Sequence, residues 1–384
     1  MPAKPERQEA RRPAGRLRSV TTISFARGVP SPDILPVDLF GEAARAAVER
    51  DGRAILNYGA AAGYGPLREW IAGRHGADPA RVVVTSGSLQ GFDFVVRHLF
   101  ASGGRAVVEA PSYDRTLKTL LRVADRVDAI VLADDGLDVE ALADSIERDG
   151  APALLYTIPT FQNPSGRTLS LENRRRLAEL VMEHNLLVYE DDPYGLVRFE
   201  GEPLPSVYEL TGGRVIFSSS FSKTIAPGMR VGYLILPEPL VRPVESLATD
   251  TYVSAPIFVQ GALYEFVSAG HFEPNLERTR AALRARRDAM LEALERELPE
   301  GSSWSRPQGG YFLWLDLPAA VRADDLLARA TERGVTFVKG SDFFPDGRGG
   351  ESARLAFSFP SVDEIHEGIG RLGALVRDVA AVAA

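Results

Sequence analysis

The sequence has no cysteine and little histidine or methionine. Its 384 residues include five His, four Met and no Cys. Without cysteine the chain has no disulfide bonds, no thiolate metal site and no thiol nucleophile. The five histidines are scattered, and no two of them have the spacing of a metal-ligand pair. We therefore expect neither thiol chemistry nor a histidine-bound metal.

The sequence also lacks a long hydrophobic run and an overall basic charge. No apolar segment approaches the roughly 18–20 residues of a membrane-spanning helix, and no secretory signal is visible. The net charge is −8, and only the N-terminus is rich in Lys and Arg. We interpret residues 1–20 as a flexible N-terminal arm, with a binding role as the less favoured alternative. The composition favours a cytoplasmic protein that binds neither nucleic acid nor membrane.

Short β-branched runs alternate with helical patterns from about residue 80 to residue 235. Strands that are apolar on both faces and alternate with helices indicate a mostly parallel sheet between helices. The expected strands are 81–85, 105–108, 127–132, 153–157, 186–189, 214–217 and 231–236. The expected helices between them are 88–101, 114–124, 138–148 and 171–184. We predict an α/β fold with a mostly parallel seven-stranded sheet in the large domain.

The pattern changes after about residue 275. A long charged helix at 273–297 precedes strands at 311–315, 335–338 and 354–359, which are separated by helices at 323–333 and 361–379. This order indicates a smaller α/β C-terminal domain. The predicted organisation is a segment packing with the small domain at 21–35, a large domain at 36–275 and a small domain at 276–384.

Polar residues follow five of the expected strands where each strand ends, which is where open parallel sheets bind ligands. The turn Ser86–Gly91 opens a helix, and its free N–H groups suit a phosphate. The other strand ends are followed by Tyr113, by Asn163, by Glu190 with Asp191 and Asp192, and by Ser218–Tyr233 with Lys223 and Arg230. Taken singly, these features are modest signals, because tight turns, aromatic packing and solvated loops also produce them.

Taken together, these residues match the requirements of pyridoxal 5'-phosphate. A lysine at the end of a buried strand is costly unless its charge is offset or its amine is used. An amine can form a Schiff base with the cofactor's aldehyde, a carboxylate can keep the pyridine nitrogen protonated, and an arginine with hydroxyls can bind the phosphate. We therefore predict that Lys223 is linked to this cofactor.

The chain resembles the fold-type I, class I/II pyridoxal-phosphate aminotransferases from about Ile23 onward. Within them it looks closest to the 2-aminoadipate and kynurenine aminotransferases and the effector domains of MocR-type regulators. The motifs that carry the resemblance occur in order at 24–30, 56–59, 63–68, 85–91, 111–113, 162–166 (Gln-Asn-Pro-Ser-Gly), 190–194 (Glu-Asp-Asp-Pro-Tyr), 220–223 (Ser-Phe-Ser-Lys), 227–230 (Pro-Gly-Met-Arg), 309–314 and 354–358 (Arg-Leu-Ala-Phe-Ser).

The resemblance implies catalytic roles for Lys223, Asp191 and Tyr194. Lys223 would hold the cofactor and then move a proton between substrate and cofactor. Asp191, and not Asp192, would pair with the pyridine nitrogen, because the family places this carboxylate three residues before a tyrosine, here Tyr194. Tyr194 and Asn163 would hydrogen-bond the phenolic oxygen, and Tyr113 would stack on the ring.

The same resemblance implies the anion-binding residues and a homodimer. The phosphate would be held by Ser88, the Leu89 backbone N–H, Ser220, Ser222 and Arg230, and by Tyr58 from the neighbouring subunit. The substrate's α-carboxylate would pair with Arg354, with Asn163, Gly28 and Arg27 as further substrate contacts.

Three positions depart from the family pattern. Leu89 stands where glutamine is common, so only its backbone remains for the phosphate. Lys339 replaces a common proline and is expected only to adjust a loop. Arg27 replaces a small residue before Gly28. It would either read an acidic substrate side chain or point to solvent, and the sequence does not choose between these.

The leading expectation is an aminotransferase with a ping-pong mechanism that moves nitrogen from an L-amino acid to a 2-oxo acid such as 2-oxoglutarate. One alternative is another pyridoxal-phosphate reaction on the same scaffold, by a β-lyase, decarboxylase, cyclase or oxidase. Another is a non-catalytic regulator domain. The latter is disfavoured because only about 20 residues precede the matching region, too few for a winged-helix domain.

Overall fold

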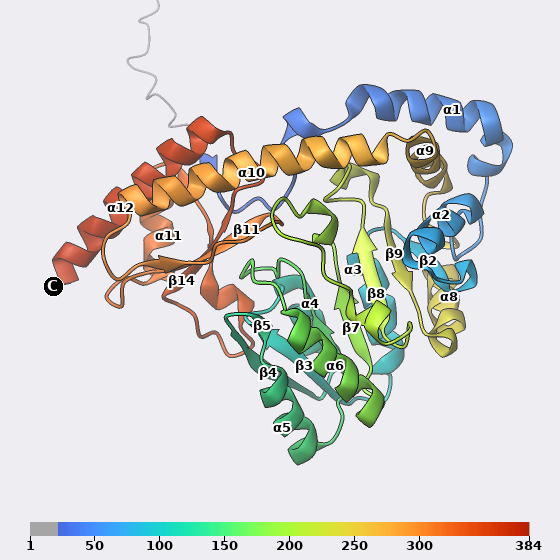
Figure 1. The fold of residues 1–384 in the computed structure, drawn as a ribbon, viewed down its shortest axis with the longest axis horizontal. Coiled ribbons are helices and arrows are strands. Elements are labelled where there is room, and N and C mark those ends of the chain that lie inside the picture. The colour runs from blue at the N-terminus through green and yellow to red at the C-terminus, as the bar shows by residue number, and fades with distance from the viewer. Residues whose placement is uncertain (1–21, 384) are drawn as a thin grey trace, which may run out of the picture.

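The computed structural model of the protein describes residues 22–383. The predicted arm at residues 1–20 lies outside the described residues. A large α/β unit and a smaller α/β unit lie side by side, and helix α10 (Phe272–Glu297) runs along both of them (Figure 1). The two units therefore share one long helix, and a site between them can draw residues from both.

The large unit is built on a sheet with the strand order β2-β9-β8-β7-β6-β3-β4-β5. The strands are β2 (Val82–Thr85), β9 (Gly232–Ile235), β8 (Ile216–Ser220), β7 (Val188–Asp191), β6 (Leu154–Thr157), β3 (Arg105–Ala110), β4 (Arg126–Ala133) and β5 (Gly136–Leu137). The pairs from β8 through β4 are parallel, and β9 is antiparallel to both of its neighbours. The predicted mostly parallel sheet is confirmed, with the two-residue β5 as an additional edge strand.

Helices cover both faces of this sheet (Figure 1). They are α1 (Val37–Ile55), α2 (Gly65–His75), α3 (Ser88–Leu99), α4 (Asp114–Val123), α5 (Val139–Asp149), α6 (Leu171–His184), α7 (Val207–Leu210), α8 (Glu238–Tyr252) and α9 (Ile257–Ser268). Alternate strand residues enter two separate hydrophobic cores: Val83 and Val108 belong to one, and Val82 and Val107 to the other. Burial on both faces explains the continuous apolar runs in the sequence.

Two strands extend further into their polar ends than predicted. β7 includes Glu190 and Asp191, and β8 continues to Ser220. Backbone pairing persists there because Asp191 is in register with Ser218, and Ser220 with Gly232. The side chains of Asp191 and Ser220 are therefore held by the sheet itself, whereas Lys223 lies just beyond the end of β8.

The small unit contains an antiparallel sheet with the order β10-β11-β14-β13. These strands are β10 (Ser303–Trp304), β11 (Phe312–Asp316), β14 (Ser352–Ala356) and β13 (Val338–Lys339), and helices α11 (Ala323–Glu332) and α12 (Val362–Ala383) complete the unit. β1 (Ile23–Ser24) pairs in parallel with β12 (Val335–Thr336). The strand predicted at 335–338 is thus two strands, because its first half pairs with β1 and its second half with β14.

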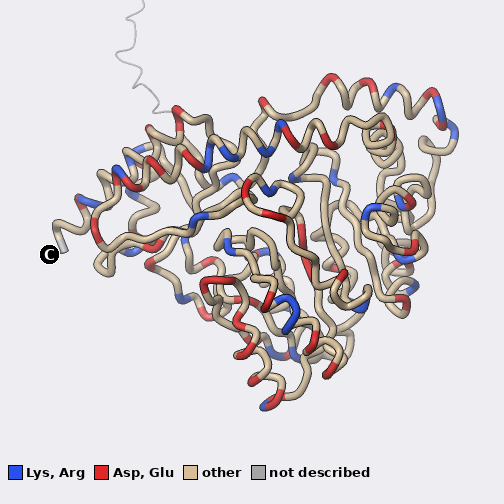
Figure 2. Tube along the Cα trace, viewed as in Figure 1, with Lys and Arg blue, Asp and Glu red and all other residues tan. Residues whose placement is uncertain are grey.

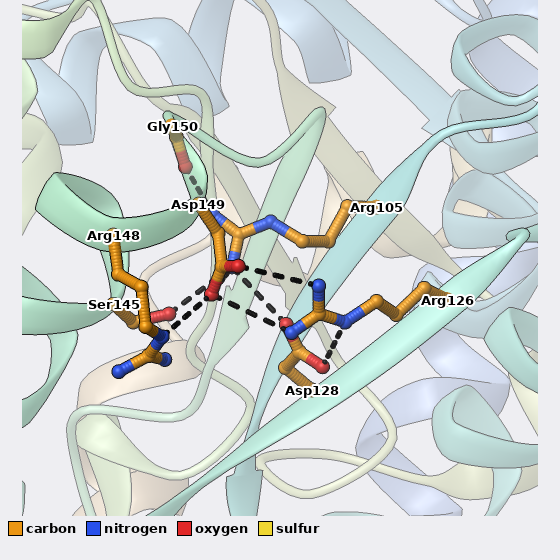
Figure 3. Close-up of polar contacts among 7 residues, drawn as sticks. All are labelled: Arg105, Arg126, Asp128, Ser145, Arg148, Asp149 and Gly150. Carbon is orange, nitrogen blue, oxygen red and sulfur yellow. Dashed lines mark hydrogen bonds and ion pairs between the residues drawn. The ribbon is translucent and has the colours of Figure 1, made fainter.

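A polar cluster joins the amino ends of β3 and β4 to the end of α5 (Figure 3). Arg105 donates to Asp128 at 3.1 Å, to Ser145 at 3.1 Å and to the carbonyl of Gly150. Arg126 donates to Asp128 at 2.7 Å. Because this cluster lies at the amino ends of the strands, it stabilises the end of the sheet opposite to the polar strand ends described above.

Charges of both signs are interspersed along the chain. In Figure 2, segments coloured for Lys and Arg alternate with segments for Asp and Glu along most helices. Across residues 22–383, none of the helices is both long and apolar enough to cross a membrane.

Candidate active site

A pocket of about 510 Å³ lies at the carboxyl ends of the sheet strands, between the large and the small unit. Its walls include all but two of the residues that the sequence predicted for the site. Those in the walls are Gly28, Ser88, Leu89, Tyr113, Asn163, Asp191, Tyr194, Ser220, Ser222, Lys223, Arg230 and Arg354. Tyr58 and Arg27 are not among them. Residues from seven segments far apart in sequence thus meet in one cavity.

Lys223 follows β8 and is enclosed by backbone, aromatic rings and other cations. Its Nζ donates to the carbonyl oxygen of Gly28 at 2.5 Å and lies 5.2 Å from the ring centre of Tyr311. Burial lowers the pKa of Lys223 to about 8, and the positive charges of Arg354 and Arg230 act in the same direction. The neutral amine, which a nucleophile or a base requires, is therefore far more populated near physiological pH than in an ordinary lysine.

Asp191 is the last residue of β7 and presents a buried carboxylate to the pocket. Its Oδ2 accepts a hydrogen bond from the Tyr156 hydroxyl at 2.8 Å. Its Oδ1 is buried and accepts no hydrogen bond of ordinary geometry from the described residues. Burial raises the pKa of Asp191 to about 6, although the hydroxyls of Tyr156 and Ser218 and the charge on Lys223 lower it. A buried carboxylate oxygen without a partner is suited to a cationic N–H group of a ligand.

Asp192 has a different environment from Asp191. Its Oδ1 accepts the backbone N–H of Gly195 at 2.7 Å, and it lines a separate cavity. The geometry therefore offers Asp191, and not its neighbour, to the pocket.

An anion cradle is formed where α3 begins. Gly87, with φ of +87°, precedes α3, whose first residue Ser88 has a free backbone N–H. Arg230 donates to Ser222 at 3.5 Å, and the Ser220 hydroxyl donates to Ser222 at 2.9 Å. A Cβ on Gly87 would lie 2.1 Å from Nη2 of Arg230, so only glycine lets the guanidinium cross the helix start. A helix N-terminus, a guanidinium and two hydroxyls together suit a phosphate dianion.

Arg354 projects from β14 into the opposite side of the pocket as a buried cation. The central carbon of its guanidinium, Cζ, lies 4.2 Å from the ring centre of Phe312 and 5.2 Å from the ring centre of Phe343. Nη1 donates to Asn163 Oδ1 and Nη2 to the carbonyl of Ala26, both at 3.0 Å. Among the described residues, no carboxylate forms an ion pair with Arg354, and burial lowers its pKa. A buried guanidinium without a counter-ion is suited to a ligand carboxylate.

Gly28 is required for the position of the aromatic ring under Arg354. A Cβ at Gly28 would lie 2.3 Å from Cζ of Phe312. Phe312 is also the ring nearest to the Arg354 guanidinium. The N-terminal segment thus determines the geometry of a cation on the small unit.

Three further predicted residues line the pocket near Lys223 and Arg354. Tyr113 precedes α4, and burial raises its pKa to about 12. Tyr194 is 3% exposed, with a pKa that burial raises well above its usual value. Asn163 is 4% exposed and accepts from Arg354. Both phenols are therefore protonated donors at neutral pH.

Tyr58 and Arg27 lie outside the pocket of their own chain. The Tyr58 side chain is 82% exposed. The Arg27 guanidinium lies 5.0 Å above the ring of Phe359. Lys339, the third departure from the family pattern, pairs with Asp324 at 3.2 Å and lies outside the pocket as well. In this structure Arg27 stacks on Phe359 and is not part of the pocket wall.

Sequence reasoning missed two buried residues that hold the site. Tyr156 donates to Asp191, and it was read only as part of an apolar strand. Glu109, 1% exposed, accepts from Thr157 at 2.5 Å and from Gln162 at 2.9 Å. Burial raises the pKa of Glu109 to about 7. The signal was available for Glu109, because a carboxylate inside the apolar run 105–110 needs buried donors.

Comparisons with known proteins agree with this geometry. Residues 28–372 match the family model "Aminotransferase class I and II". An aromatic-amino-acid aminotransferase of Thermococcus litoralis is 34% identical, over 93% of this chain and 88% of that protein. The crystal structure of an α-aminoadipate aminotransferase from Thermus thermophilus, complexed with N-(5'-phosphopyridoxyl)-L-leucine, has a TM-score of 0.90 at 34% identity and covers 94% of this chain and 93% of its own. A transcriptional regulator of Bacillus subtilis is 28% identical over 90% of this chain and 72% of its own length.

The first prediction concerns the lowered pKa of Lys223. Only a neutral amine attacks an aldehyde, so covalent attachment of pyridoxal phosphate to the apoprotein should accelerate as pH rises through about 8. The measurement is the initial rate of borohydride-stable incorporation between pH 6 and 10.

Two variants control that profile. Lys223→Ala should incorporate no cofactor, and Arg354→Gln should move the midpoint to higher pH, because a cation that lowers the lysine pKa is removed. A rate that stays flat over this pH range in the unaltered protein would contradict the assignment.

The second prediction concerns Tyr156. The hydrogen bond from Tyr156 lowers the pKa of Asp191, and Tyr156→Phe removes this bond. The pKa of Asp191 should therefore rise in the variant, and the acidic limb of the activity profile should move to higher pH. Loss of one hydrogen bond to a charged group should also slow the reaction about tenfold. Tyr189→Phe is a matched control, since it removes a neighbouring buried hydroxyl that makes no hydrogen bond to Asp191. An unmoved acidic limb, or an equal change in both variants, would refute the role of Tyr156.

Proposed function

The chain is a pyridoxal-phosphate-dependent aminotransferase of the class I and II family, and we propose that it moves the amino group of an L-amino acid to a 2-oxo acid in two half-reactions. We further propose 2-oxoglutarate as the acceptor. The observation that carries the proposal is the pair formed by Lys223 and Arg354. A buried amine with a pKa of about 8 shares a pocket with a buried guanidinium that forms no ion pair with a carboxylate of residues 22–383.

The pocket residues fit the cofactor. Bound there, pyridoxal phosphate supplies an aldehyde that condenses with amines and a ring that accepts electrons. The partnerless Oδ1 of Asp191 suits the pyridine N–H, and the cradle of Ser88, Ser220, Ser222 and Arg230 suits the phosphate. Tyr113 offers a ring face on which the cofactor ring can stack. We assign Asn163 and Tyr194 to hydrogen bonds with the phenolic oxygen of the cofactor.

Lys223 has two roles in this proposal. Its amine would hold the cofactor. Once a substrate amine takes that place, the freed Lys223 amine would take the proton from the substrate Cα and deliver it to the carbon of the cofactor's former aldehyde group. A pKa of about 8 supports both directions, because a general base works best when its pKa lies near the operating pH.

Arg354 orients the substrate through its α-carboxylate. Two N–H groups of a guanidinium match the two oxygens of a carboxylate. The side chain is restrained by Phe312 and Phe343 and by the hydrogen bond to Asn163, so little side-chain entropy is lost on binding. The substrate Cα is thereby held toward Lys223, which lies in the same pocket.

A homodimer completes the cofactor site in this proposal. The exposed Tyr58 lies in a loop beside the start of α9, since the Gly59 N–H donates to Ser254 at 3.4 Å. Leu56, Val253 and Phe258 in these two segments are also exposed, at 69%, 45% and 38%. Exposed apolar side chains of neighbouring segments are typical of a protein interface. We propose that this surface meets a second copy, whose Tyr58 donates to the phosphate.

The third prediction tests the reaction. A single amino acid should convert the holoenzyme to its aminated cofactor form, and a 2-oxo acid should restore the original spectrum. Lys223→Ala should lose this conversion and keep the fold, as measured by circular dichroism. Release of carbon dioxide, ammonia or hydrogen peroxide without oxo-acid recovery would point to another pyridoxal-phosphate reaction. Binding without any conversion would point to a regulator.

The fourth prediction tests Tyr58 in trans. Tyr58→Ala should weaken cofactor binding about tenfold, the effect of one lost hydrogen bond to a phosphate. A heterodimer of one Tyr58→Ala subunit and one Lys223→Ala subunit should contain one site with both native residues, because each residue comes from a different chain.

Cofactor titration of that purified heterodimer is the measurement. Recovery of native affinity and activity at half of the sites is the expected result. Affinity that stays at the level of Tyr58→Ala would mean that Tyr58 acts within its own chain or not at all.

A further inference from the structure

The pocket contains one more cation than the proposed chemistry uses. Lys223, Arg230 and Arg354 have roles with the cofactor and the α-carboxylate. Arg115, the second residue of α4, also lines the pocket, and its side chain is 68% exposed. None of the sequence motifs pointed to Arg115, because a charged residue in the first turn of a helix is common on any surface.

Arg115 is incompletely bonded within the chain. Its Nε lies 3.6 Å from Asp114 Oδ2, and Lys118 lies closer to the same carboxylate at 3.2 Å. Neither Nη of Arg115 donates to an acceptor on the described residues. Two parallel N–H groups therefore remain for a carboxylate of a ligand.

The position of Arg115 relates it to the substrate and not only to solvent. The positive charges of Arg115 and Arg354 both act to lower the pKa of Tyr113, which lies in the wall of the pocket. The negative charge of Asp114 likewise acts to raise the pKa of Arg354. One end of α4 thus faces the same space as the α-carboxylate site.

The rest of the space left for a substrate side chain is apolar. Apart from Asp114 and Arg115, the lining residues without a proposed contact to the cofactor or the α-carboxylate are Ala26, Val29, Ile158, Pro193, Pro227, Phe312 and Val338, of which Ala26 and Phe312 support Arg354. Such walls accept an apolar side chain, and among these residues of the chain only Arg115 offers a partner to a side-chain carboxylate. Arg27 lies outside these walls, on Phe359.

We propose that Arg115 binds the side-chain carboxylate of dicarboxylic substrates, so that the pocket accepts both dicarboxylic and apolar amino acids. This inference rests on the proposed amino transfer, since it assigns the substrate class of the same site. Asp114 opposes such binding, because its carboxylate competes for the guanidinium. An exposed guanidinium–carboxylate pair contributes modestly, so the effect is about three- to fivefold in affinity.

The experiment measures binding of two unreactive acids to the holoenzyme by calorimetry. Glutarate carries two carboxylates and 4-methylpentanoate carries one. Arg115→Gln should weaken glutarate binding about three- to fivefold relative to 4-methylpentanoate binding, and Asp114→Asn should strengthen glutarate binding. Arg122→Gln is the matched control, because it removes the same charge from the exposed face of the same helix, outside the pocket.

Half-reactions with glutamate and leucine give a second readout, in which Arg115→Gln should reduce the preference for glutamate by the same factor. Equal weakening of both acids, no weakening of either, or loss of glutarate binding with Arg27→Gln in place of Arg115→Gln would each overturn the inference. Glutarate binding needs no turnover. The protein could therefore bind glutarate through Arg115 and still fail to transfer amino groups. That result would overturn the proposed function but would support Arg115 as a carboxylate-binding residue.

Discussion

The site depends on the burial of one amine among other positive charges. Lys223 loses most of its hydration, and Arg354 and Arg230 add repulsion, so the cost of protonating the amine is high. The carbonyl of Gly28 holds Nζ in place, and Asp191 limits the depression of the pKa. The parallel sheet makes this arrangement possible, because β7 and β8 end side by side and bring Asp191 and Lys223 to one edge.

The second cation of the site depends on contacts between the two units. Arg354 belongs to the small unit, but its hydrogen-bond partners are Asn163 in the large unit and Ala26 in the N-terminal segment. Buried arginines of α10 hold these parts together: Arg287 pairs with Glu200 at 2.5 Å, and Arg286 with Asp33 at 2.9 Å. The position of Arg354 in the pocket therefore depends on the contacts between the two units.

Much of the fold was predictable because its signals are local. Strands buried on both faces appear as continuous apolar runs, and α6 begins and ends at the predicted residues 171 and 184. The strand predicted at 335–338 was wrong in one respect, since it changes partners after Thr336. Pairing partners lie far away in sequence, so no local pattern could indicate that change. Arg27 illustrates the same limit, because its stacking on Phe359 depends on how two distant segments pack.

By itself the sequence determined the order of the strands and helices along the chain, the glycine at the start of α3 and the types of residue at the strand ends. These depend on propensities and steric limits that act over a few residues. Only the tertiary structure decided which polar atoms meet. Arg354 reaches partners 191 and 328 positions away, and the Tyr156 hydroxyl reaches Asp191 across the sheet. Such contacts form only when whole elements pack, because burial, and not local chain geometry, selects a partner for each polar group.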